Sequence, residues 1–175
     1  MSDNDYKTEI AKILIDIESV KFSFKNPFTL TSGHKSPVYV DCRKIISFMK
    51  ERNIILKHAR NYLVNNNIEY DLLAGGETAG IPYASILSEQ LQKKMIYIRK
   101  KPKGFGKNQQ IEGSYLKDEK VLLIEDLATD GGSKIIFIEA ILEAGLKIKD
   151  VFVIFYYDIF DFTKSKLFDY KIKIH

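Results

Sequence analysis

The segment that most constrains the fold is a short apolar run followed directly by two acids and a turn of small residues. Residues 121–124 are all apolar, and so short a run is typical of a strand that is buried on both faces. Glu125 and Asp126 come next, and residues 127–133 (Leu-Ala-Thr-Asp-Gly-Gly-Ser) then lead into a helical pattern. Strands of this kind occur in parallel sheets that helices cover. The segment therefore predicts an α/β fold.

Apolar runs and helical patterns alternate along the rest of the chain, in agreement with an α/β fold. We expect strands at 70–74, 94–98, 120–124 and 150–157, helices at 3–20, 50–66, 79–92 and 131–144, two short strands within 28–41 and a last short helix within 160–168. Gly75 and Gly76 are expected to form the turn after the first of the four longer strands. This alternation implies right-handed crossovers and a central, mostly parallel sheet flanked by helices.

Length and composition are those of one soluble globular domain. The chain has 175 residues, of which 45% are hydrophobic, and its mean hydropathy is -0.16. No run approaches the ~20 apolar residues that span a bilayer, and the polar first residues do not resemble a secretory signal. Cys42 is the single cysteine, which is typical of a reducing compartment because no internal disulfide can form. We expect a single cytoplasmic domain over residues 1–175, without a membrane partner.

Positive charge is concentrated in one segment, residues 99–107, which Pro and Gly residues interrupt. The whole chain carries a formal charge of +4 and has a pI of about 8.9, which mildly favours anionic partners. No zinc-ligand spacing, helix-turn-helix pattern or array of stacking aromatics accompanies the basic residues, so nucleic acid is not expected as a partner. Taken alone, the segment has an ordinary alternative as a solvated loop.

The turn after the buried run has the features of a phosphate site. In an open parallel sheet, ligands bind at the carboxyl ends of the strands, where this turn must lie. Gly131 and Gly132 allow close backbone approach, and Thr129 and Ser133 add hydroxyl groups. Successive backbone N–H groups and a helix N-terminus can then bind one phosphate. A Walker loop needs Gly-Lys-Ser/Thr and a dinucleotide site needs three spaced glycines, and neither pattern is present.

The two acids before this turn need a different partner, because a carboxylate repels phosphate. Glu125 and Asp126 are suited to accept hydrogen bonds from a ribose diol, as an acid does in dinucleotide sites. The combination therefore predicts a site for a phosphorylated ribose. The competing interpretation is an ordinary strand–turn–helix with Asp126 near the N-cap of the helix.

The string 121–133 resembles the signature of type I phosphoribosyltransferases, and the chain as a whole resembles their bacterial orotate phosphoribosyltransferase branch. The resemblance covers about 28–157 and rests on four blocks in the family's order, namely 28–39, 76–82, 99–106 with 110–113, and 121–133. It implies the type I phosphoribosyltransferase fold, a central and mostly parallel sheet flanked by helices with a small N-terminal hood. The hood is expected at about 1–45, the core at about 50–160 and a mobile catalytic loop at about 99–113.

The resemblance also implies a reaction. Ribose-5-phosphate would pass from phosphoribosyl pyrophosphate to orotate, giving orotidine 5'-phosphate and pyrophosphate in de novo pyrimidine biosynthesis. Mg²⁺ is the implied cofactor, held mainly by substrate oxygens, so no protein metal ligand is expected. The implied assembly is a homodimer in which the catalytic loop is shared across subunits.

Site residues follow by matching positions in the four blocks. Glu125 and Asp126 would hold the ribose hydroxyls and take part in catalysis. Arg99, Lys100 and Lys103 would meet the pyrophosphate and are the other catalytic candidates. The residues expected to wrap the rest of phosphoribosyl pyrophosphate are Leu127, Ala128, Thr129, Asp130, Gly131, Gly132 and Ser133, and those expected at orotate are Thr129, Lys35 and Tyr39.

Three positions depart from the family's usual pattern. Phe105 stands where the loop usually carries a His, Asp130 stands where a neutral residue is usual, and Ile159 follows Asp158 where some members have an Arg. These departures keep two alternatives open. One is a transferase for a purine or another base, and the other is a regulator that binds phosphoribosyl pyrophosphate without turnover.

Overall fold

The computed structural model describes residues 3–30, 33–102, 110–129, 131–159 and 161–175. The chain forms two compact units, one up to Asn61 and the other from Tyr62 onward, and each is described by itself. Among the described helices, none is both long enough and apolar enough to cross a membrane.

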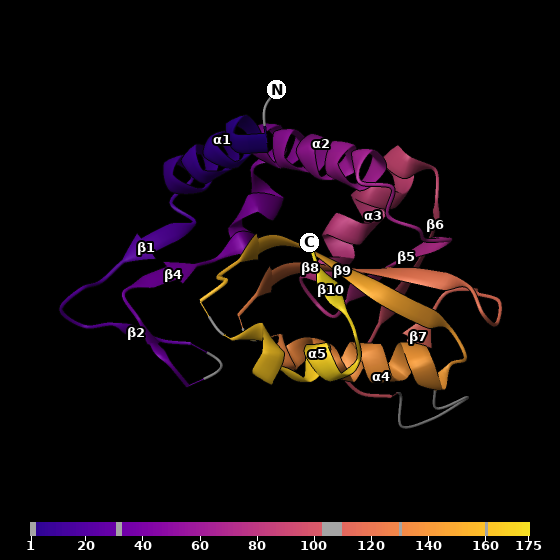
Figure 1. The fold of residues 1–175 in the computed structure, drawn as a ribbon. Helices are drawn as coiled ribbons and strands as arrows, with labels where there is room; N and C mark the ends of the chain where they lie inside the picture. Colours follow the sequence, from indigo (N-terminus) through magenta and orange to yellow (C-terminus); the bar gives the residue numbers. More distant parts are fainter. Residues whose placement is uncertain (1–2, 31–32, 103–109, 130, 160) are drawn as a thin grey trace. The chain divides into compact units, whose positions relative to one another are not determined.

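The first unit combines helices with two small antiparallel pairs of strands (Figure 1). Its elements are α1 (Asp3–Asp16), β1 (Val20–Phe22), β2 (Phe28–Thr29), β3 (Lys35–Ser36), β4 (Val38–Val40), the 3-10 helix η1 (Cys42–Ser47) and α2 (Met49–Asn65), which continues into the second unit. Strand β2 pairs with β3 and β1 with β4, so the short strands expected within 28–41 are confirmed. His58 of α2 stacks on Tyr6 of α1 and lies 2.7 Å from Glu9 Oε2.

The second unit is built on a six-stranded sheet with the order β10-β9-β8-β5-β6-β7. The strands are β5 (Leu72–Gly76), β6 (Lys94–Ile98), β7 (Ile111–Glu112), β8 (Lys120–Ala128), β9 (Lys147–Tyr156) and β10 (Lys173–Ile174). All neighbours are parallel except β6 and β7, which confirms a mostly parallel sheet. Strand β8 lies next to β5 and β9, and the apolar run 121–124 is buried as expected.

Helices cover both faces of this sheet. They are α3 (Gly80–Leu91), η2 (Gly132–Lys134), α4 (Ile135–Glu143), η3 (Phe162–Lys164) and α5 (Lys166–Asp169). A Cβ atom added to Gly75 would clash with Ile81 of α3, whereas one added to Gly76 would meet Phe137 of α4 at 2.7 Å. Successive strand residues face opposite sides of a sheet, so α3 and α4 lie on opposite faces, as Figure 1 shows.

Two local expectations were wrong, both about where strands end. Gly75 and Gly76 are not a turn but the last two residues of β5, paired with Tyr97 and Ile98 of β6. Strand β8 does not stop before the acids but continues through Glu125 to Ala128. In both places, backbone pairing with a neighbouring strand outweighs local signals, a glycine pair in one case and charged side chains in the other.

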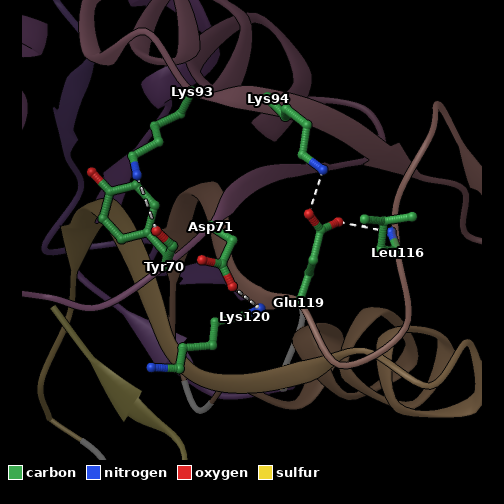
Figure 2. Close-up of polar contacts among 7 residues, drawn as sticks. All are labelled: Tyr70, Asp71, Lys93, Lys94, Leu116, Glu119 and Lys120. Atoms are coloured by element: carbon green, nitrogen blue, oxygen red, sulfur yellow. Dashed lines mark hydrogen bonds and ion pairs between the residues drawn. The ribbon is translucent and has the colours of Figure 1, made fainter.

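The amino ends of the central strands are held by polar contacts (Figure 2). Glu119, just before β8, forms an ion pair with Lys94 of β6 and accepts a 2.7 Å hydrogen bond from the Leu116 N–H. The Lys120 N–H donates to Asp71 at 2.8 Å, which joins the start of β8 to the start of β5. These contacts lie at the amino ends of the strands, opposite to their carboxyl ends, so we infer that they contribute to the stability of the fold.

Candidate functional site

Three parallel strands end at the same edge of the sheet and bring the predicted ligand residues to it. Strand β5 lies between β6 and β8 and is parallel to both, so the carboxyl ends of the three strands lie together. They lead into residues 77–79, 99–102 and 129–134, respectively. Ligands of open α/β sheets bind in the crevice at this edge, which makes these segments the candidate site.

Glu125 is buried in this region and forms an ion pair with a lysine that follows the turn. Its carboxylate lies 2.7 Å from Lys134 Nζ, and the two side chains are only 7% and 5% exposed. Burial raises the pKa of the Glu125 carboxyl; Lys134 opposes the rise by its charge and hydrogen bond, Asp126 adds to it and Lys100 opposes it more weakly. The side chain of Lys134 also reaches Ser133, with 3.2 Å between Nζ and Oγ.

Two glycines make the space that the Glu125 carboxylate occupies. A Cβ atom on Gly80, the first residue of α3, would lie 2.7 Å from Glu125 Oε1, and one on Gly76 would clash with the same oxygen. A side chain at either position would therefore displace the carboxylate. The Gly76–Pro82 block thus shapes the acid site from the neighbouring strand and helix.

The other residues of β8 and its turn that were expected to bind phosphoribosyl pyrophosphate differ in their exposure. Asp126 and Leu127 are half-buried, Ala128 and Thr129 are buried, and Gly132 and Ser133 are exposed. Gly131 has a φ of 78°, a left-handed conformation that glycine adopts without strain, and its carbonyl accepts a 3.0 Å hydrogen bond from the Lys134 N–H. Asp130 lies outside the described residues. The helix expected at 131 begins one residue later, as the 3-10 turn η2.

The basic segment leaves β6 at this edge and is held at both of its ends. The Lys100 N–H donates to Glu77 Oε2 at 2.7 Å, and the Arg99 N–H donates to the Gln110 carbonyl at 2.9 Å. Gln110 in turn donates from Nε2 to the Arg99 carbonyl at 2.7 Å. In the part of the chain that the structure describes, the buried Arg99 Nε has no hydrogen-bond partner. Lys103 lies outside the described residues, as does Phe105.

Lys35 and Tyr39 belong to the first unit and are held there. Lys35 Nζ donates to Thr29 Oγ1 at 2.6 Å across the β2–β3 pair. Tyr39 packs against Phe28, with 5.5 Å between ring centroids, and its hydroxyl oxygen accepts a 3.3 Å hydrogen bond from Arg43 Nη2. Their expected contact with orotate remains a prediction.

Sequence reasoning missed two residues of this edge. It gave no role to Glu77, although Glu77 follows β5 directly and holds the backbone of the basic segment at Lys100. Lys134 was not among the expected site residues either, although the lysine is buried against Glu125. The available signal was that Lys134 directly precedes the apolar helix start Ile-Ile-Phe-Ile, which indicates burial. An ammonium group is rarely buried without a partner, so a charged partner was to be expected.

Within the described ranges, no group of three or more His, Cys, Asp or Glu side chains is placed to hold a metal ion. Carboxylates do lie at the carboxyl ends of the central strands, but the Glu125 carboxylate forms an ion pair with Lys134.

Comparison with known proteins agrees with this geometry. Residues 47–161 match the family model of the phosphoribosyl transferase domain. Over 167 residues the chain is 48% identical to the orotate phosphoribosyltransferase of a Ruegeria species, covering 94% of this chain and 74% of that protein.

Solved structures share the fold. The orotate phosphoribosyltransferase of Aeropyrum pernix superposes with a TM-score of 0.79 at 25% identity, covering 94% of this chain and 90% of that one. The UMP synthase of Leishmania donovani superposes with a TM-score of 0.79 at 29% identity, and the match covers 97% of this chain but only 35% of the synthase. The chain therefore belongs to the phosphoribosyltransferase family, within its group of orotate phosphoribosyltransferases.

Proposed function

We propose that this protein transfers ribose-5-phosphate from phosphoribosyl pyrophosphate to orotate, producing orotidine 5'-phosphate and pyrophosphate for pyrimidine biosynthesis. The observation that carries the proposal is the convergence of acids, basic residues and a glycine turn at the carboxyl ends of β5, β6 and β8. The 48% identity to an orotate phosphoribosyltransferase supports orotate as the acceptor.

The reaction separates charge, and the proposed site places opposite charges to match. Breaking the bond between ribose C1 and pyrophosphate builds positive charge on the ring and negative charge on the leaving group, as in glycoside hydrolysis. Asp126, with Glu125 beside it, would face the ribose hydroxyls, and Arg99 with Lys100 and Lys103 would meet the pyrophosphate. Groups aimed in advance at developing charge contribute about 3 kcal/mol each. Where orotate binds with its ring N1 already deprotonated by solvent, the N1 anion forms the bond to C1 as the bond from C1 to pyrophosphate breaks, and no general base is needed.

The turn after β8 would hold the 5-phosphate. Gly131 provides the left-handed backbone that curls the turn, and the exposed Gly132 and Ser133 can present N–H and hydroxyl groups to an anion. Thr129, Lys35 and Tyr39 are the residues that we propose to contact orotate.

Magnesium fits this site as an ion carried by the substrate. Mg²⁺ prefers oxygen ligands, keeps several waters and is often bound through substrate phosphates and one or two carboxylates. The described residues offer separate carboxylates at this edge and no cluster of three or more metal-binding side chains. We propose that oxygens of the substrate would hold the ion, which would neutralise charge on the leaving group.

We also propose a cytoplasmic homodimer in which the loop at 99–113 serves the neighbouring subunit. Cys42 is the single cysteine of the sequence and cannot form an internal disulfide, which supports a reducing location. The hydrogen bonds between Arg99 and Gln110 support a loop whose two ends are fixed next to β6 and β7.

Pyrophosphate release tests the proposal directly. The protein is mixed with Mg²⁺, phosphoribosyl pyrophosphate and one of orotate, uracil, adenine, guanine or hypoxanthine. We expect release with orotate alone. Release only with a purine would assign the chain to another base, and binding of phosphoribosyl pyrophosphate without release from any base would make it a regulator.

A loop variant extends the same assay. Lys103→Ala is expected to lower turnover at least ~10²-fold because it removes a cation from the leaving group. Lys101→Ala, in the same segment, is the matched control and should retain turnover. Equal rates for the two variants would remove Lys103 from the proposed site.

A further inference from the structure

The Lys134 ammonium bridges two parts of the candidate site that are eight residues apart in the chain. It lies 2.7 Å from the Glu125 carboxylate in β8 and 3.2 Å from Ser133 Oγ at the end of the turn. Its backbone N–H also donates to the Gly131 carbonyl at 3.0 Å. The turn after β8 is thereby closed by a side-chain contact and a backbone contact of the same residue.

The chemistry of an ammonium group decides which way the serine hydroxyl can act. Lys134 Nζ carries only donors, so Ser133 Oγ must accept in this contact. The hydroxyl proton of Ser133 is then left to donate elsewhere, and the exposed position of Ser133 allows an anion to receive it. The lysine itself is only 5% exposed, so it supports the turn from inside and does not meet a ligand directly.

From these contacts we propose that Lys134 is the positioning residue of the phosphate turn, tying the turn to the buried Glu125 carboxylate and orienting Ser133 toward the 5-phosphate of the ribose. The inference rests on the proposed function for the identity of the ligand. A turn held in its binding shape before the ligand arrives loses less conformational freedom on binding, and affinity rises accordingly.

The expected signature is weaker binding of the ribose phosphate with little effect on turnover. The turn holds the 5-phosphate equally in the ground state and the transition state, so its loss raises KM for phosphoribosyl pyrophosphate and leaves kcat nearly unchanged. A purely structural lysine would behave differently. Its loss would reduce the amount of folded protein, which lowers apparent kcat at an unchanged KM.

The test compares Lys134→Met, Lys134→Arg and the wild-type protein. We expect Lys134→Met to raise KM for phosphoribosyl pyrophosphate and the Kd of ribose 5-phosphate, measured by calorimetry, about tenfold each, with kcat within about threefold. The Kd of pyrophosphate should stay within about twofold because that ligand does not use the turn. Lys134→Arg retains the charge and should recover most of the affinity.

A matched control is Lys147→Met, which removes the exposed ion pair with Asp118 at the start of β9 and should bind ribose 5-phosphate like the wild type. Should Lys134→Met fail to fold, Lys134→Gln, whose amide can still donate a hydrogen bond to the Glu125 carboxyl, carries the same ribose 5-phosphate comparison. Wild-type affinity in either variant, or a loss confined to kcat, would overturn the inference.

The binding measurement also separates this inference from the proposed function. Ribose 5-phosphate binding requires no acceptor base. A wild-type protein that binds it but releases no pyrophosphate with orotate would contradict the function while the positioning role stood. Normal turnover with orotate, combined with unchanged KM and Kd in Lys134→Met, would contradict the positioning role alone.

Discussion

At the scale of single residues, the site depends on the space that glycines leave for a buried carboxylate. Gly80 stands at the start of α3, where helix propensity alone favours alanine over glycine by up to about 1 kcal/mol. Yet a Cβ atom there would clash with the Ile124 carbonyl oxygen and lie 2.7 Å from Glu125 Oε1. The backbone oxygen cannot move aside as a flexible side chain could.

Gly80→Ala is therefore expected to destabilise the protein by about 1–3 kcal/mol, the usual cost of overpacking, and to weaken ribose 5-phosphate binding. Urea unfolding and calorimetry measure the two effects. Ser85→Ala, at an exposed position of the same helix, is the control and should not lower stability. A more stable Gly80→Ala variant would mean that propensity, and not the contact with β8, governs this position.

At the scale of elements, the carboxyl ends and the amino ends of the central strands have different roles. The carboxyl ends of the strands carry the acids, the basic segment and the turn, whereas the amino ends carry ion pairs and backbone contacts (Figure 2). Glu119 is the centre of the second group, because it binds Lys94 and the Leu116 N–H with its two oxygens. Its hydrogen bond with Lys94, followed by that with Leu116, lowers the pKa of its carboxyl group.

Glu119→Gln should lower the urea midpoint near neutral pH without changing KM for phosphoribosyl pyrophosphate. A carboxyl whose pKa is lowered by folding stabilises the folded state above its ordinary pKa of about 4.3, and this stabilisation is lost as pH falls through the folded value. The midpoints of variant and wild type should therefore begin to converge as pH falls below the ordinary pKa and should meet below the folded pKa of Glu119. A difference that persists undiminished in acid would assign the effect to packing instead of charge.

At the scale of the whole chain, the second unit is closed by contacts between residues distant in sequence. His175 lies beyond β10 and its Nε2 is 2.8 Å from Asp150 Oδ1, while Nδ1 is 3.2 Å from the hydroxyl of Tyr62. The histidine side chain is 2% exposed. Its backbone also pairs with β9, because the His175 N–H donates to Val151 at 2.9 Å.

His175→Ala should lower the free energy of unfolding by about 1–3 kcal/mol, since it removes the hydrogen bonds that a buried imidazole makes with the half-buried Tyr62 and Asp150. The urea unfolding transition measures this loss. Lys173→Ala, an exposed position in β10, is the control and should stay within about 0.5 kcal/mol of the wild type. Identical transitions for the two variants would show that the contacts of His175 do not hold β10 to the sheet.

Most of the fold and part of the site could be predicted from the sequence by itself. Strands β6, β8 and β9 and helices α2, α3 and α4 follow from apolar runs and helical periodicity, because a long element must bury one face and its pattern records which face. The acids, the glycine turn and the basic segment are local strings, so their presence at one edge followed from strand–helix alternation.

Features that depend on partners far along the chain could not be predicted from the sequence and are seen only in the folded structure. The two-residue strands β7 and β10 are too short to carry a periodic pattern, and they exist because a longer neighbour pairs with them. Gly76 became part of a strand because β6 lies beside it, and its lack of a side chain leaves room for Glu125. Lys134 pairs with the Glu125 carboxylate because folding buries both charges together, and a buried ammonium group requires a neutralising neighbour.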